Sequence, residues 1–105
     1  MGQVLHEDLS ELKPLVVTRG HDVQQSLGTS VTALLDTDAH AAQIVIDGDQ
    51  SINSQRFSLE SKVIGVIATQ QPVASDLRLL AGILEIATEL ERMGDYAKDI
   101  ARIAL

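Results

Sequence analysis

Apolar residues recur every three or four positions along most of this chain, with only two interruptions. Spacing of this kind puts apolar side chains on one side of an α-helix that packs against other helices. The first segment, about residues 4–35, contains Leu5, Leu9, Leu12, Val16, Val23, Leu27, Val31 and Leu34. Pro14 lies within this segment, and we expect it to kink the helix or to mark its true start.

The two interruptions consist of residues that typically end one helix and begin the next. Asp36, Thr37 and Asp38 form a polar break with side chains that can cap a helix, so a second helix is expected over about residues 38–69. The apolar face of that helix would contain Ala41, Ile44, Val45, Ile52, Leu59, Val63, Val66 and Ile67. The residue before Pro72 is disfavoured in a helix, so a third helix is expected over about residues 73–104.

Three helical segments of similar length, joined by short connections, make neighbouring helices antiparallel. No segment shows the alternation of apolar and polar residues that is typical of a β-strand. With 105 residues, the chain has the size of one ordinary domain. The sequence therefore predicts an all-α, up-down-up antiparallel three-helix bundle that forms a single domain over residues 1–105.

The composition excludes several classes of function. The chain has 15 acidic and 8 basic residues, whereas a nucleic-acid-binding protein needs a basic face. Phe57 and Tyr96 are the only aromatic residues, too few to stack bases, and the absence of cysteine excludes thiolate chemistry. The strongly apolar run at residues 63–68 is too short to cross a bilayer. These features predict a soluble cytoplasmic protein without membrane insertion.

Two pairs of polar residues are candidates for a functional site, because the members of each pair are four residues apart. Glu91 and Asp95 share one face of the expected third helix. If the chain folds back at Pro72, Asp49 lies level with Asp95, and Asn53 lies level with Glu91. The helical phase places these residues toward the apolar side of each helix. Three carboxylates and one amide are thus expected to face one another across the seam between two helices.

A cation is one way to stabilise such a group, because converging carboxylates otherwise repel one another. Oxygen ligands favour Mg²⁺, Ca²⁺ or Mn²⁺, with iron as a further option. Gly48 and Gly94 adjoin the two aspartates and would let the helix backbones approach closely. The alternative is that Arg92, Lys98 or Arg102 neutralises the carboxylates in ordinary ion pairs.

Two segments in the second half of the chain resemble a known family. They read QQPVASDLR over residues 70–78 and LERMGDYAKDIA over residues 90–101. Together with VIDGDQSIN (residues 45–53) and HEDLSEL (residues 6–12), they are similar to the PhoU family of phosphate-uptake regulators. The similarity extends over essentially the whole chain and implies a three-helix PhoU repeat.

The resemblance implies a non-enzymatic adaptor that couples the Pst phosphate transporter to a membrane histidine kinase and restrains the phosphate-starvation response. Such a protein would be cytoplasmic, with a peripheral position at the inner face of the membrane as an option. The family usually has two repeats and this chain has one, with a helical pattern that continues to Leu105. We therefore expect either a truncated two-repeat protein or a single repeat that associates into a homo-oligomer.

The family's acidic motifs are associated with bound metal, often iron or zinc. The resemblance thus implies that Asp49, Asn53, Glu91 and Asp95 are candidate ligands for Fe, Zn, Mn or Mg ions. Asn53 stands where a second carboxylate would be, which lowers the negative charge of the site. The family-signature turn contains Pro72, Asp76 and Arg78, which either form a docking face or serve only to start the helix.

Other functions were weighed against this one. A structural helical repeat used for oligomerisation would need no metal. A histidine phosphotransfer module would need an exposed histidine, for which His6, His21 and His40 are candidates. An enzyme ranks last, because the sequence shows neither a nucleophile–base pair nor a phosphate-binding glycine loop.

Overall fold

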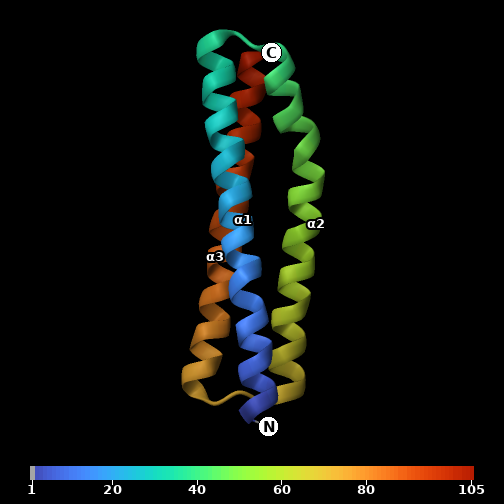
Figure 1. Ribbon diagram of the computed structural model, residues 1–105, viewed down its shortest axis with the longest axis vertical. Helices are drawn as coiled ribbons and strands as arrows, with labels where there is room; N and C mark the ends of the chain where they lie inside the picture. Colours follow the sequence, from blue (N-terminus) through green and yellow to red (C-terminus); the bar gives the residue numbers. More distant parts are fainter. Residues whose placement is uncertain (1) are drawn as a thin grey trace.

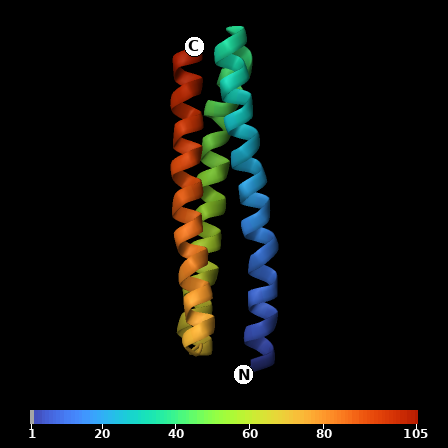
Figure 2. The same ribbon diagram turned by 90° about the vertical axis from the view of Figure 1, so that its left-hand side faces the viewer.

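The computed structural model describes the chain from residue 2 to residue 105, with side chains at positions 5, 7–51 and 53–105. Its three helices are α1 (Gly2–Asp36), α2 (Ala39–Gln70) and α3 (Ala74–Ala104). Helix α2 runs antiparallel to α1 and α3 in a rod of 54 × 19 × 16 Å, with the two termini at opposite ends (Figure 1 and Figure 2). The predicted all-α, up-down-up three-helix bundle is confirmed, and the helix ends differ from the expected ones by one or two residues.

Short turns connect the helices, and each contains one residue with a left-handed backbone. In the first turn this residue is Thr37, with φ of 54°, and Asp38 follows as the cap of α2. The Asp38 carboxylate accepts a hydrogen bond of 3.1 Å from the backbone N–H of Ala41, as the polar break predicts. In the second turn it is Gln71, with φ of 45°, immediately before Pro72.

Pro14 lies inside α1, which begins at Gly2, so the suggestion that this proline marks the true start of the helix is wrong. A proline within a helix removes one backbone hydrogen bond. Leu9 and Leu12, which precede Pro14, are both buried, and their packing explains why the helix begins before the proline. The ring itself is exposed and lies away from these contacts.

The apolar core has two parts with different side chains. The leucine core lies toward the N-terminus and contains Leu5, Leu9, Leu12, Leu59, Val63, Val66, Leu80, Ile83 and Ala87. The alanine core lies toward the C-terminus and contains Ala33, Ala42, Val45, Ala97, Ala101 and Ala104. Small side chains at that end allow the helices to pack closely.

Part of the predicted apolar face is not buried. Val31, Leu34 and Ile44 are exposed. The side chains of Ile52 and His6 lie outside the described part of the structure. No helix among the described residues is both long and apolar enough to span a membrane.

Candidate functional site

Charged and polar side chains from all three helices lie between the leucine core and the alanine core. We call this set the central polar layer. It contains Arg19 from α1, Asp49, Asn53, Arg56 and Glu60 from α2, and Glu91 and Lys98 from α3.

Asp49 is the most buried carboxylate of the central polar layer, with only 8% of the residue exposed. Its Oδ2 atom accepts a hydrogen bond of 3.0 Å from Lys98 Nζ, which crosses from α3. The same oxygen accepts a hydrogen bond of 3.3 Å from Asn53 Nδ2, one turn along α2. The predicted burial of Asp49 is thus correct, and its negative charge is balanced by Lys98.

Arg56 joins the other carboxylates of the layer. Its Nε atom donates a 3.0 Å hydrogen bond to Glu60, and its Nη1 atom donates a hydrogen bond to Glu91 on α3. The hydrogen bond to Glu60 raises the pKa of the Arg56 guanidinium above its ordinary value, although burial acts in the opposite direction. The Arg56 guanidinium also lies 5.4 Å from the centre of the Phe57 ring.

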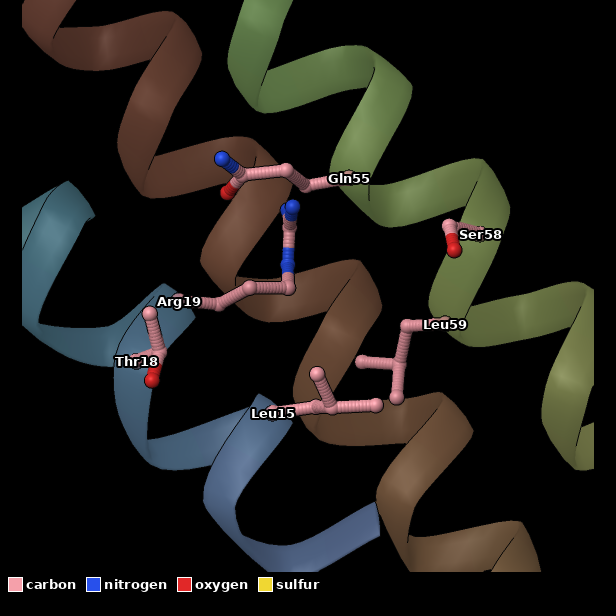
Figure 3. Close-up of a pocket in the computed structure, with 6 residues that line it drawn as sticks. All are labelled: Leu15, Thr18, Arg19, Gln55, Ser58 and Leu59. Carbon is pink, nitrogen blue, oxygen red and sulfur yellow. The ribbon is translucent and has the colours of Figure 1, made fainter. Parts of the chain in front are cut away.

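Arg19 brings α1 into the layer and is only 3% exposed. Burial lowers the pKa of its guanidinium, as does the nearby positive charge of Arg56, whereas the carboxylates of Asp22, Glu60 and Glu91 raise it. Figure 3 shows its side chain reaching from α1 into the space between α1 and α2, in front of α3. A cavity of about 250 Å³ opens there, lined by Leu15, Thr18, Arg19, Gln55, Ser58 and Leu59.

The four predicted metal ligands do not come together as one group in the structure. Asp49 and Asn53 are in contact, Glu91 is half-buried beside Arg56, and Asp95 is exposed. Among the described residues, no three histidine or acidic side chains are grouped as a metal site. Metal ligation by these residues therefore stays a prediction.

Two features of the seam between α2 and α3 differ from those that the spacing predicts. Asp49 pairs with Lys98 rather than facing Asp95, and the partner of Glu91 is Arg56 rather than Asn53, an offset of three residues in each case. Gly48 is exposed, and no atom lies within 4 Å of the position that a Cβ atom would take there, so it does not allow close backbone approach. Gly94, by contrast, is buried.

Arg19 and Arg56 are not among the site residues that the sequence predicts. A signal was present, because each arginine falls within an apolar stripe. Arg19 is three residues after Val16 and four before Val23, and Arg56 is three residues before Leu59. A cation at such a position is expected to reach a carboxylate on another helix, because a buried charge needs a partner.

The remaining predicted residues lie away from the central polar layer. His21 and His40 are exposed, and His6 is outside the described side chains. In the family-signature turn, Asp76 is in the first turn of α3, and Arg78 Nε donates a 3.4 Å hydrogen bond to the backbone oxygen of Ala74. A docking role for this turn stays a prediction.

A second feature of α3 is a set of apolar side chains that are exposed to solvent. We call it the outer α3 stripe, and it contains the exposed residues Leu79, Ile86, Met93, Tyr96 and Ile103. Seven residues separate the first from the second, the second from the third, and Tyr96 from Ile103. Helix α3 thus has one apolar face in the core and another exposed to solvent.

Comparison with known proteins decides the family. The PhoU domain matches residues 18–104, which include the central polar layer and the outer α3 stripe. The chain belongs to the PhoU domain family. The predicted resemblance is therefore confirmed over most of the chain.

Individual PhoU proteins are similar over almost the full length of this chain. The phosphate-specific transport system accessory protein PhoU of Escherichia coli K12 is 39% identical over 98 residues, which are 93% of this chain and 41% of that protein. The PhoU homologue of Aquifex aeolicus is 38% identical over 101 residues, which are 96% of this chain and 46% of that protein. The PhoU repeat described here thus spans less than half the length of these relatives.

Proposed function

We propose that this chain is a PhoU-type adaptor, a non-enzymatic regulator that acts on phosphate uptake and on phosphate-starvation signalling. The observation that carries the proposal is the match of the PhoU domain to residues 18–104. The relatives are named as accessory proteins of the phosphate-specific transport system. The proposed partners are a subunit of the phosphate ABC transporter and a sensor histidine kinase, both reached from the cytoplasmic face of the membrane.

The outer α3 stripe is the proposed docking surface for the transporter. Contiguous exposed apolar side chains on a small protein commonly mark a protein-binding site. Ile86, Met93 and Ile103 would occupy an apolar groove at helical spacing, and Tyr96 adds a ring with a polar tip. Glu89, three residues after Ile86 and four before Met93, lies among the apolar residues of the stripe and forms an exposed ion pair of 3.2 Å with Arg92. A non-obligate protein interface is typically no more apolar than the rest of the surface.

A pair of matched substitutions tests this docking surface. Ile86→Asp puts a charge in the middle of the outer α3 stripe, and Ile64→Asp puts the same charge on an exposed position of α2. Both side chains are exposed, so both variants are expected to fold. Binding to transporter subunits from the same cell should weaken about tenfold or more for Ile86→Asp, because a buried unpaired charge is costly.

Biolayer interferometry with transporter subunits in nanodiscs measures this effect. Binding of Ile64→Asp should equal that of the parent protein. If the parent protein fails to bind any transporter subunit, the adaptor function is wrong. If both variants bind as the parent does, the adaptor function stands but the docking surface lies elsewhere.

The outer α3 stripe also supports a second candidate function, namely oligomerisation. Residues seven apart on one helix face are typical of helices that pair with each other. A homo-oligomer formed through this stripe would behave as a structural repeat rather than as an adaptor. Light scattering after size-exclusion chromatography separates the two functions. If the chain self-associates through the stripe, the parent protein is an oligomer and Ile86→Asp is a monomer.

Metal binding is the remaining part of the proposal, with Asp49, Asn53, Glu91 and Asp95 as ligands for an Fe, Zn, Mn or Mg ion. Carboxylate and amide oxygens are suitable for hard divalent ions. In the arrangement described, such an ion would have to displace Lys98 from Asp49 and Arg56 from Glu91. Metal binding thus depends on the strength of the ion pairs that Lys98 and Arg56 form with these carboxylates.

A further inference from the structure

Each of the two inner carboxylates of the central polar layer is paired with a basic side chain from the neighbouring helix. Lys98 on α3 reaches Asp49 on α2, and Arg56 on α2 reaches Glu91 on α3. The two ion pairs thus cross the same seam in opposite directions. The carboxylates that would attract a metal ion are already neutralised by side chains of the chain itself.

The pair between Asp49 and Lys98 is the more buried of the two. The Asp49 side chain is 11% exposed, and the Lys98 side chain is 27% exposed. Water screens a pair at this depth less well than it screens surface charges. The Asp49 Oδ2 atom also accepts the hydrogen bond from Asn53, so both groups are directed at the same oxygen.

We propose that Lys98 excludes divalent metal ions from Asp49 by balancing the charge of the carboxylate and by occupying its Oδ2 atom. This inference rests on the metal-binding part of the proposed function and names the residue that controls it. A metal ion would approach the carboxylate oxygen to about 2.0–2.6 Å. The Lys98 ammonium lies 3.0 Å from that oxygen, and two cations cannot share the position without strong repulsion.

Lys98 also has an advantage over a dissolved ion, because it is attached to the adjacent helix. A tethered group competes at a high effective concentration, which a free metal ion has to exceed. Arg56 acts in the same way at Glu91, and a guanidinium does not lose its proton in the physiological range. The parent chain is therefore expected to bind divalent metal weakly, and removal of the Lys98 charge is expected to strengthen binding.

Titration with Mn²⁺, followed by electron paramagnetic resonance, tests the proposal on three proteins. The first protein is the parent chain. The second is Lys98→Met, which keeps a long unbranched side chain without the charge. The third is Lys62→Met, which removes an exposed lysine on α2, away from Asp49. We expect Lys98→Met to bind Mn²⁺ about tenfold more tightly than the parent, or more. Lys62→Met should bind as the parent does, and adding Asp49→Asn to Lys98→Met should abolish the gain.

The outcomes distinguish this inference from the proposed function. Equal saturable binding by the parent and by Lys98→Met, lost on Asp49→Asn substitution, would overturn the role of Lys98 and leave the metal site intact. No binding by any of the proteins would overturn both. Circular dichroism shows whether each variant keeps its helical content, and Lys98→Gln replaces Lys98→Met if the latter does not fold.

Discussion

Among the individual residues, Arg56 is the side chain that links the two half-buried glutamates of the central polar layer. It donates hydrogen bonds to Glu60 on its own helix and to Glu91 on α3. Hydrogen bonds between charged groups are stronger than those between neutral groups, and partial burial reduces screening by water. Loss of Arg56 would leave two half-buried carboxylates without this cation, so its contribution should be measurable in the free energy of unfolding.

We predict that Arg56→Gln lowers the free energy of unfolding by about 1 kcal/mol, the net value typical of a hydrogen-bonded group. Urea denaturation followed by circular dichroism measures this change. Arg92→Gln is the matched control, because Arg92 pairs with Glu89 on the surface, where both side chains are more than half exposed. That variant should lose less than about 0.5 kcal/mol. Equal losses in the two variants would contradict the special role of Arg56.

The candidate site could be predicted from the sequence only in part, and the reason lies in side-chain length. Helical phase correctly placed Asp49 on the buried side, and Lys98 was among its expected cationic partners. The phase did not reveal Arg56 as the partner of Glu91, because a long flexible side chain can reach several positions on the next helix. Both ion-pair partners therefore lie three residues beyond the positions that the spacing predicts.

Among the helices, α1 contains Pro14 in its interior, where a proline removes one backbone hydrogen bond. Pro14 is exposed within the helix, so the cost falls on the backbone rather than on core packing. The packing of Leu9 and Leu12 into the leucine core offsets this cost. The apolar stripe of α1 was correctly predicted from the sequence. Whether the helix would extend across Pro14 was not, because the free energy gained by burying leucines and the cost of a proline in a helix are both a few kcal/mol.

Pro14→Ala is predicted to raise the free energy of unfolding by about 2 kcal/mol. This value starts from the free-energy difference between proline and alanine in a helix interior. From it we subtract the stabilisation that proline provides by restricting the unfolded chain. Ser54→Ala, at an exposed position within α2, is the comparison and should gain only about 0.5 kcal/mol. A loss of stability in Pro14→Ala would mean that the proline ring makes a favourable contact.

The alanine core leads to a different prediction, which concerns size. Ala101 is fully buried on α3 between the other two helices, so a larger side chain has no space. Ala101→Leu should lower the free energy of unfolding by about 1–3 kcal/mol, the usual cost of overpacking. Ala81→Leu, at an exposed position on the same helix, should change stability by less than about 0.5 kcal/mol. Guanidinium denaturation of both variants measures the difference.

In the bundle as a whole, α3 has two distinct apolar surfaces, one buried and one exposed. The inner face of α3 forms part of both cores and holds Glu91 and Lys98 of the central polar layer. The outer α3 stripe faces solvent, and α1 and α2 leave it uncovered. The periodicity was sufficient to predict the bundle but not this second face, since an apolar residue in a helix does not by itself show whether it is buried.

Hydroxyl-radical footprinting is the measurement that tests the proposed docking role most directly. Met93 and Tyr96 lie in the outer α3 stripe, and exposed Phe57 on α2 is an internal control. If α3 docks as proposed, mixing with transporter subunits in nanodiscs reduces the oxidation of Met93 and Tyr96 and leaves that of Phe57 unchanged. Protection of Phe57 with Met93 and Tyr96 still fully oxidised would contradict the account and place the interface on α2.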